Sequence, residues 1–487
     1  MKADILKLEP SLIWQHFYEI SRIPRCSRQE AQARAYVISV AERNAAAYRT
    51  DQAGNLVVTC NASPGLEDTP VVVLQSHLDM VCEKNQDSDH DFSMSPLDLK
   101  TEGDWVTADQ TTLGADNGVG VAAALAVLED DTLIHGPLEL LFTIDEESGL
   151  TGARALEAEM LAGRILINMD TEEHGTLYIG CAGGRDTELF LDTDWETVTD
   201  DHRCMQVRLG GLSGGHSGID IHQQRGNSVK LLNRFLWKES PRLGLRLGVL
   251  AGGSKHNAIP RESDATVFVP PGAEADLEQA VVSYDRLLKH EHNRVDPGVF
   301  VVLETSPVRQ PKGWLSSRDQ DRLLNLLYAI PHGVITMSEA VPELVQTSTN
   351  LAVVHTEKAG IRILTSQRSA VESELTDISN QIAAVGQLAG ARIHQGPGYP
   401  PWTPDPTSDL LATARRVFHR AFGSEPQVKA VHAGLECGII GAKFSKMEMI
   451  SFGPTILGAH SPSERMNIPS VERFWTFLTA MLQALAA

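Results

Sequence analysis

The chain has 487 residues, of which 42% are hydrophobic and 22% charged, a balance that is typical of globular proteins and excludes a disordered chain. Its net charge of −21 argues against nucleic acids and anionic membranes as partners, because both are bound through basic surfaces. Six cysteines without a C-x-x-C pair argue against a disulfide scaffold or a thiolate zinc site and predict reduced thiols in a cytoplasmic protein. No apolar run approaches the ~20 residues that cross a bilayer, and the start lacks an apolar signal core, so we expect neither a membrane span nor a secretory signal.

In chain order, the first 186 residues alternate between helix-like and strand-like patterns. Apolar periodicity predicts helices at 12–18, 29–42 and 119–128, and β-branched or apolar runs predict strands at 55–59, 71–75, 138–144 and 165–168. Strands that alternate with helices indicate an α/β fold whose central sheet is mostly parallel.

The pattern changes near residue 186. A β-α-β-β-α-β order, which is typical of a ferredoxin-like unit, runs from the predicted strand 205–209 to the strand 299–304, and a similar order follows between 317 and 394. A Pro-rich stretch at 397–406 then reads as a linker. We therefore expect a split domain formed by 1–186 and 396–487, with an inserted α+β domain of two ferredoxin-like units at 187–395.

Acids and histidines follow several of the predicted strands, where open α/β sheets bind ligands. Taken singly, each has an ordinary explanation as a surface histidine, an Asp-Gly turn or a solvated strand end. Together, two histidines and three carboxylates could hold two zinc ions with one carboxylate shared. The candidates from which such a set could be drawn are His77, Asp79, Asp116, the acids Asp145, Glu146 and Glu147, Asp170, and His460.

These residues, in this order, resemble the co-catalytic zinc peptidases that include aminoacylases, carboxypeptidase G and dipeptidases. Within that family the motifs are most similar to those of the aminoacyl-histidine (Xaa-His) dipeptidases, and the resemblance covers nearly the whole chain. The motifs are QSHLDMVCEKN (75–85), TTLGADNGVG (111–120), DEESGLTGA (145–153), LINMDTEEHGTLYIGCAGG (166–184), GGHSGIDIHQQRGNS (214–228), HNAIPRE (256–262), HAGLECG (432–438) and GAHSP (458–462).

The resemblance implies a set of ligands for two zinc ions. Co²⁺ or Mn²⁺ could replace the zinc. His77 and Asp170 would bind one ion, and Glu147 and His460 would bind the other. Asp116 would bridge both ions.

The resemblance also implies two residues that act beside the metals. Asp79 would hydrogen-bond the imidazole of His77 and fix its tautomer, and Glu146 would be the general base. The acid cluster is a triplet, however, and strand alternation would put Asp145 and Glu147 on the same side. We keep Glu146 as the base because the family pair is Glu-Glu.

Two further features of the family can be compared with this sequence. The family has a cis peptide after the bridging aspartate, here between Asp116 and Asn117. The family's first motif commonly continues as His-x-Asp-x-Val-Pro, whereas here Cys82 replaces the proline, which changes the stiffness of the loop and not a ligand.

In the inserted domain, the resemblance implies substrate contacts. His216 in GGHSG would reach the scissile carbonyl, Asn257 would contact the substrate, and Arg368 would hold its C-terminal carboxylate, which suits the planar guanidinium. The lid would close over the substrate.

The resemblance therefore implies a cytoplasmic metal-dependent dipeptidase that hydrolyses short peptides with free termini, such as β-alanyl-histidine. The expected partner is a small peptide substrate, with a homodimer as a further option. An N-acyl amino acid deacylase of the same family and a non-catalytic binding protein on the same fold are the alternatives.

Overall fold

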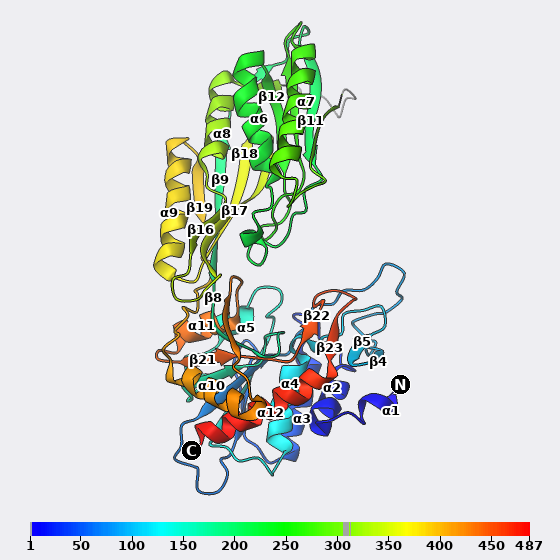
Figure 1. The fold of residues 1–487 in the computed structure, drawn as a ribbon, viewed down its shortest axis with the longest axis vertical. Coiled ribbons are helices and arrows are strands. Elements are labelled where there is room, and N and C mark those ends of the chain that lie inside the picture. Colours follow the sequence, from blue (N-terminus) through cyan, green and yellow to red (C-terminus); the bar gives the residue numbers. More distant parts are fainter. Residues whose placement is uncertain (1, 305–310, 312) are drawn as a thin grey trace. The chain divides into compact units, whose positions relative to one another are not determined.

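The structure is a computed structural model that describes residues 2–304, 311 and 313–487. The chain divides into two compact units, both drawn in Figure 1. Unit 1 comprises Met1–Cys181, Trp402–Ala430 and Leu435–Ala487, and unit 2 comprises Ala182–Pro401 and Val431–Gly434. Among the described residues, none of the helices is both long and apolar enough to cross a membrane.

Unit 1 is built on an eight-stranded sheet with the order β1-β2-β6-β3-β7-β21-β8-β20. The strands are β1 (Tyr48–Thr50), β2 (Leu56–Cys60), β3 (Val72–His77), β6 (Leu138–Thr143), β7 (Ile165–Asn168), β8 (Thr176–Cys181), β20 (Gln427–Val431) and β21 (Glu448–Ser451). The neighbours β6, β3, β7 and β21 pair in parallel, whereas β1, β2 and β8 pair antiparallel. The expectation of a mostly parallel sheet therefore holds only for its centre, and the whole sheet is mixed.

Helices and a small second sheet complete unit 1. The helices are α1 (Lys2–Ile5), α2 (Ser11–Ile20), α3 (Ala31–Arg43), α4 (Ala115–Glu129), α5 (Thr151–Ala155), α10 (Asp409–Phe422), α11 (Glu436–Lys443) and α12 (Ile468–Leu485). The second sheet has the order β22-β23-β5-β4, formed by β4 (Leu99–Glu102), β5 (Trp105–Ala108), β22 (Ile456–Leu457) and β23 (Arg465–Asn467). Helix α4 packs against both α2 and β3, and its Ala, Val and Leu side chains are buried on every side, as expected for a helix that is apolar all round.

Unit 2 contains a nine-stranded sheet with the order β14-β11-β13-β12-β17-β18-β9-β19, and β16 also pairs with β17. Its strands are β9 (Gly183–Asp192), β11 (Arg203–Gly210), β12 (Arg246–Gly252), β13 (Ser263–Val269), β14 (Phe300–Glu304), β16 (Gly333–Met337), β17 (Val345–Thr356), β18 (Gly360–Ser369) and β19 (Arg392–Gln395), with a separate pair of β10 (Trp195–Thr197) and β15 (Gly313–Leu315). Its helices are α6 (Ser228–Leu243), α7 (Glu274–Glu291), α8 (Ser317–Ala329) and α9 (Glu372–Leu388), which lie along the sheet in Figure 1 and share one apolar core with it.

The two halves of this sheet repeat one topology. The first half runs β11-α6-β12-β13-α7-β14, with the sheet order β14-β11-β13-β12. The second half has the corresponding order β19-β9-β18-β17, but its first strand, β9, precedes the whole first half in the chain. The sequence predicted a second unit from the elements between 317 and 394 but did not identify its first strand, because β9 is separated from its partner β18 by about 170 residues of chain.

The prediction that all thiols are reduced is wrong for two of the six cysteines. Cys26 and Cys82 form a disulfide with their Cα atoms 5.7 Å apart. The two residues are 56 positions apart in the sequence, so no local spacing could indicate the pair. The fold brings them together because the segment before α3 lies beside the loop after β3, where Cys26 bridges to Met80.

Candidate metal centre

The candidate ligands lie at the carboxyl ends of the parallel strands in unit 1. Strand β3 ends at His77, the segment after β6 carries Glu147, and the segment after β7 carries Asp170. Asp116 lies in the first turn of α4, and His460 lies in the loop between β22 and β23. Parallel strands direct their carboxyl ends to one edge of a sheet, which explains why residues so distant in sequence meet.

The five residues form two groups that share Asp116. In the first group, His77 Nε2 lies 3.1 Å from Asp116 Oδ1 and 3.1 Å from Asp170 Oδ1. In the second, His460 Nε2 lies 3.1 Å from Asp116 Oδ2 and 3.1 Å from Glu147 Oε2. Each oxygen of the Asp116 carboxylate therefore faces a different histidine.

This arrangement fits two divalent cations. Two ligands that each lie about 2.0 Å from a tetrahedral zinc ion are roughly 3.3 Å apart, close to the spacing between the nitrogen and oxygen atoms here. Glu147 Oε1 is buried and has no hydrogen-bond partner among the described residues. Imidazole and carboxylate together suit Zn²⁺, so the donor set is chemically appropriate as well as close enough.

The charges of the carboxylates act on both histidines. Burial by itself lowers the pKa of His77, but Asp170, Asp116 and Asp79 raise it well above its ordinary value. Hydrogen bonds with Asp116 and Glu147 raise the pKa of His460 to about 11. Without a metal, each imidazole thus holds a proton between carboxylates, at the place where a cation would lie.

Asp79 is completely buried beside His77 and has more contacts than the sequence indicated. Its Oδ1 lies 3.3 Å from His77 Nδ1. Its carboxylate also accepts hydrogen bonds from the backbone N–H of Glu146 at 3.0 Å and Glu147 at 3.2 Å, and from Ser27 Oγ at 2.7 Å. Burial acts to raise the pKa of Asp79, but the hydrogen bond from His77 and those from Ser27 and Glu146 hold it at about 2. Asp79 therefore orients both a histidine and the acid pair.

The three consecutive acids point in different directions. Asp145 is buried, has a positive φ of 49°, and bonds with Ser148 and Thr151. Glu146 and Glu147 instead lie with His77, where their donor atoms are within 4.8 Å of one another. Strand alternation does not apply because β6 ends at Thr143, before the triplet begins.

The turn that carries Asp116 is held by two residues that the sequence analysis did not identify. The peptide between Asp116 and Asn117 is cis, as the resemblance implied. The carboxylate of Glu464 accepts hydrogen bonds from the backbone of this turn, and the guanidinium of Arg25 donates to its Gly114 carbonyl. No local pattern marks either residue, because both act on a segment at least 89 positions away.

The predicted substrate residues His216, Asn257 and Arg368 belong to unit 2. His216 and Asn257 line the same cavity, of about 720 Å³. A Cβ on Gly218 would lie 3.1 Å from His216 Cε1 and 3.2 Å from Arg368 Nε. The glycine at 218 therefore allows both side chains to pack closely against its backbone. The Arg368 side chain donates to Tyr399 Oη at 3.0 Å, and its buried Nε has no hydrogen-bond partner among the described residues.

The tautomer of His216 follows from its backbone contacts. Its Nδ1 accepts hydrogen bonds from the N–H groups of Gly218 at 3.2 Å and Ile219 at 3.1 Å. Burial, together with the charge of Arg368, lowers the pKa of His216 to about 4. The ring is therefore neutral near pH 7, and its proton is on Nε2, which can donate to a carbonyl oxygen.

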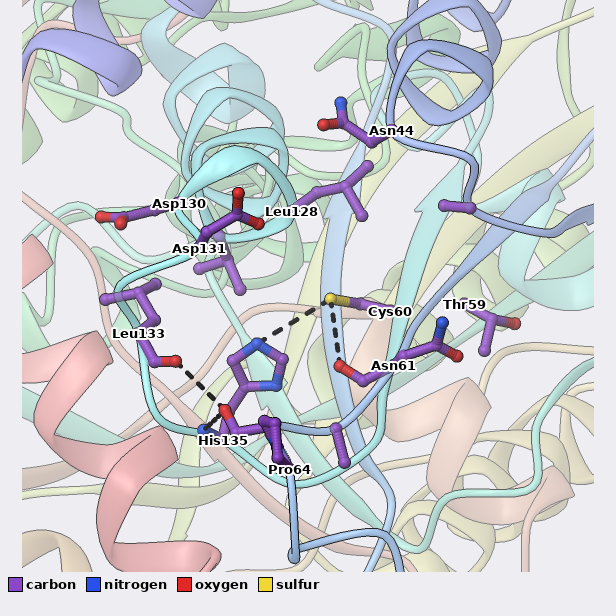
Figure 2. A pocket seen from close by; sticks show the side chains of 14 residues that line it. Asn44, Thr59, Cys60, Asn61, Pro64, Leu128, Asp130, Asp131, Leu133 and His135 are labelled. Carbon is purple, nitrogen blue, oxygen red and sulfur yellow. Dashed lines mark hydrogen bonds between the residues drawn. The ribbon is translucent and has the colours of Figure 1, made fainter.

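Unit 1 also has a polar cavity of about 270 Å³ whose lining includes none of the candidate ligands. Figure 2 shows its lining, in which the side chains of Cys60 and His135 face each other, with Sγ 3.9 Å from Nε2. Burial raises the pKa of Cys60 to about 11, so this thiol remains protonated at neutral pH. We assign no part of the metal centre to this cavity.

Comparison with known proteins identifies the family. The model of peptidase family M20/M25/M40 matches residues 73–484. The chain belongs to this peptidase family. It is 40% identical over 485 residues to the cytosol non-specific dipeptidase of Escherichia coli K12, and the match covers 100% of both chains.

Solved structures agree with this assignment. The aminoacylhistidine dipeptidase of Vibrio alginolyticus matches with a TM-score of 0.90 and 41% identity, over 99% of this chain and 98% of that one. The aminopeptidase PepT of Bacillus cereus matches with a TM-score of 0.57 at 13% identity over 99% and 100% of the two chains, which shows the shared fold alone. The chain is thus a metallopeptidase, and the expected dipeptidase class is confirmed, since the two relatives at 40% and 41% identity are dipeptidases.

Proposed function

We propose that this protein is a di-zinc dipeptidase that cleaves Xaa-His dipeptides with free amino and carboxyl ends, such as β-alanyl-histidine. The observation that carries the proposal is the shared carboxylate, because both oxygens of Asp116 lie 3.1 Å from a histidine nitrogen. The breadth of specificity needs a test, since one full-length relative is named for non-specific activity and the other for aminoacyl-histidine peptides.

In this proposal, His77 and Asp170 would hold one zinc ion, Glu147 and His460 would hold the other, and Asp116 would be shared by both groups. Co²⁺ or Mn²⁺ can replace zinc. When bound, such ions polarise the scissile carbonyl and make water more acidic. The sequence placed a catalytic domain at 1–186 and 396–487 and a lid domain at 187–395. We propose these roles for the two compact units, which divide a few residues away, after Cys181 and after Pro401.

The side chains beside the ions have separate tasks. Glu146 accepts the proton of the attacking water and passes it to the leaving amine. In the metal-free protein, burial raises the pKa of Glu146 well above its ordinary value; His77 opposes this shift and the carboxylates of Asp170 and Glu147 reinforce it. Asp79 would keep His77 Nε2 directed at the ion by holding Nδ1, which lies 3.1 Å from its backbone carbonyl oxygen and 3.3 Å from its carboxylate Oδ1.

We propose that the unit 2 residues bind the substrate. His216 donates its Nε2–H to the carbonyl oxygen as negative charge develops there. Arg368 binds the C-terminal carboxylate, for which its unpartnered buried Nε is a suitable donor. Asn257 lines the same cavity as His216 and contacts the peptide.

A dipeptide also carries a free ammonium group, which needs an anionic partner. Glu172 is a half-buried acid two residues after Asp170. In the metal-free protein, burial and the charge of Asp116 raise its pKa to about 8. We propose Glu172 as the partner of the ammonium group. An N-acyl substrate lacks that group, so this role would distinguish the dipeptidase from the deacylase.

The test is a hydrolysis panel with Zn²⁺, Co²⁺ or Mn²⁺ added. It compares Xaa-His dipeptides, other dipeptides, tripeptides and N-acetyl amino acids. We expect cleavage of dipeptides, with the highest kcat/KM for Xaa-His. Preferential cleavage of N-acetyl amino acids would assign the deacylase instead, and the absence of any hydrolysis would indicate a binding protein.

We place the enzyme in the cytoplasm, where its partner is a small peptide substrate. We propose a homodimer as its assembly. The name of the E. coli relative supports this location. The disulfide between Cys26 and Cys82 is unusual for that compartment. Thiol labelling of protein taken directly from cells decides whether the bond exists there.

A further inference from the structure

The turn before α4 exposes several backbone N–H groups that have no acceptor within the helix. Such groups at a helix start must be satisfied by other partners. Here the carboxylate of one residue, Glu464, accepts from four consecutive N–H groups, those of residues 113–116. Oε2 accepts from Leu113 N at 2.8 Å and Gly114 N at 3.0 Å, and Oε1 accepts from Ala115 N at 2.8 Å and Asp116 N at 3.4 Å.

The opposite side of the same turn is held by a buried cation. Arg25 is 1% exposed, and its guanidinium donates to the carbonyls of Leu78 at 3.1 Å, Asp79 at 2.8 Å, and Gly114. Gly114 has a φ of 65°, and a Cβ there would lie 2.5 Å from Arg25 Nη2. The backbone of Gly114 is thus held at its N–H by the Glu464 carboxylate and at its carbonyl by the Arg25 guanidinium.

We infer that Glu464, assisted by Arg25, is a positioning residue that fixes the direction of the Asp116 carboxylate. This inference rests on the proposed di-metal site. Asp116 needs a defined orientation because each of its oxygens must meet a different ion. Its own backbone is not helical, with φ −78° and ψ 113°, so the helix that follows does not determine where the side chain points.

Glu464 also connects two ligands that come from separate parts of the chain. It lies four residues after His460 in the same loop, and Glu464 N donates to Ser461 O at 3.0 Å. The side chain of His460 is 52% exposed and lies 3.1 Å from Asp116 Oδ2. Because half of the His460 side chain is exposed, the hydrogen bonds of Glu464 to the Asp116 turn set the spacing between His460 and Asp116.

The test is Glu464→Gln, with Zn²⁺ alone as the probe. An amide retains one acceptor oxygen, but its NH₂ group would face two backbone N–H donors. We expect the affinity for Zn²⁺, measured by competition with a chelator, to fall about 10- to 100-fold, as is typical when a residue that orients a metal ligand is lost. The melting temperature of the metal-free protein is measured in parallel.

Glu139→Gln is the matched control. Glu139 is a buried carboxylate in the central sheet of unit 1 that accepts from the backbone of Ala162 at 2.9 Å and Gly163 at 3.0 Å and pairs with Arg49. It is the second residue of β6, whose opposite end leads to Glu146. We expect this variant to lose thermal stability and to keep its Zn²⁺ affinity within about twofold of wild type.

Each outcome decides the inference. Equal Zn²⁺ affinity in wild type and Glu464→Gln, with a loss of melting temperature like that of the control, would show a structural role only and overturn it. If Glu464→Gln does not fold, Glu464→Asp answers the question, because its shorter carboxylate cannot reach both halves of the turn and wild-type affinity would again overturn the inference. A wild-type protein that binds no Zn²⁺ would overturn the proposed function as well.

Discussion

Among single residues, Glu146 and Glu147 are neighbours in sequence but differ in surroundings. Glu147 Oε2 lies 3.1 Å from His460 Nε2, whereas Glu146 is grouped with His77 and Glu147 and is not part of either Asp116 group. We therefore expect Glu146→Gln to lower kcat about 10²- to 10⁴-fold with both metals retained. Glu147→Gln is the companion variant and should lose metal. Metal analysis and steady-state kinetics measure both effects, and the reverse pattern would exchange the two roles.

A second residue-level prediction concerns His216. The hydrogen bond from the Nε2–H of His216 to the carbonyl oxygen would strengthen only as negative charge develops on that oxygen. His216→Ala should therefore mainly lower kcat. Arg368→Ala should mainly raise KM, since it removes a contact made to the bound substrate throughout. The pKa of His216 is about 4, so its removal should leave the kcat–pH profile unchanged in shape between pH 6 and 9. Wild-type kinetics for both variants would show that unit 2 does not supply these groups.

The histidines also predict how metal binding depends on pH. The pKa of His460 in the metal-free protein is raised to about 11 by Asp116 and Glu147, so its imidazole is protonated at neutral pH and must lose that proton to bind a cation. Affinity for Zn²⁺ should thus increase with pH across the range 6 to 9, with protons released on binding. Calorimetry in buffers of different ionisation enthalpy measures the release, and binding without proton release contradicts this account.

At the scale of elements, helix α4 depends on a glycine beside the site. A Cβ on Gly120 would lie 1.9 Å from Asn117 Oδ1, and Asn117 donates to Asp170 and to Met169 O. A helical Gly→Ala change usually stabilises by about 1 kcal/mol, but here we expect Gly120→Ala to destabilise by about 1–3 kcal/mol through overpacking and to weaken metal binding.

Denaturant unfolding and metal analysis of Gly120→Ala measure these effects. Gly441→Ala in α11 is the control, because a Cβ there meets only the flexible end of Met449 and should be nearly neutral. Equal stability of the two variants would indicate that Asn117 can move without cost.

For the whole molecule, removal of metal is the decisive perturbation. Five convergent ligands motivate two ions per chain, so chelation should abolish hydrolysis, and metal analysis of the active protein should give about two ions. Binding should also stabilise the fold, by about 2.7 kcal/mol for one site when the free ion is at 100 times its dissociation constant. Calorimetric scans with and without Zn²⁺ measure this, and full activity in metal-free protein would contradict the di-metal assignment.

The sequence by itself determined the class of the molecule and the identity of its candidate ligands. Apolar runs such as that of β3, which is buried throughout, indicate strands because a strand covered on both faces needs no polar side chains. Each of the five candidate ligands could be identified because it belongs to a short motif whose neighbouring residues also match the family. These ligands are His77, Asp116, Glu147, Asp170 and His460. Local chemistry of this kind is readable wherever the signal lies within a few positions.

The tertiary structure decided what depends on residues that are distant in the chain. Three features join distant segments. Cys26 and Cys82 form a disulfide, and Glu464 accepts hydrogen bonds from the Asp116 turn. Strand β9 precedes the first half of the unit 2 sheet in the chain but belongs to the second half. The contacts of Asp145 with Ser148 and Thr151 also required the structure, since β6 ends at Thr143 and strand alternation does not reach the acid triplet. Sequence patterns report a residue's neighbours in the chain, whereas these features are set by packing and hydrogen bonds between segments that only the fold brings together.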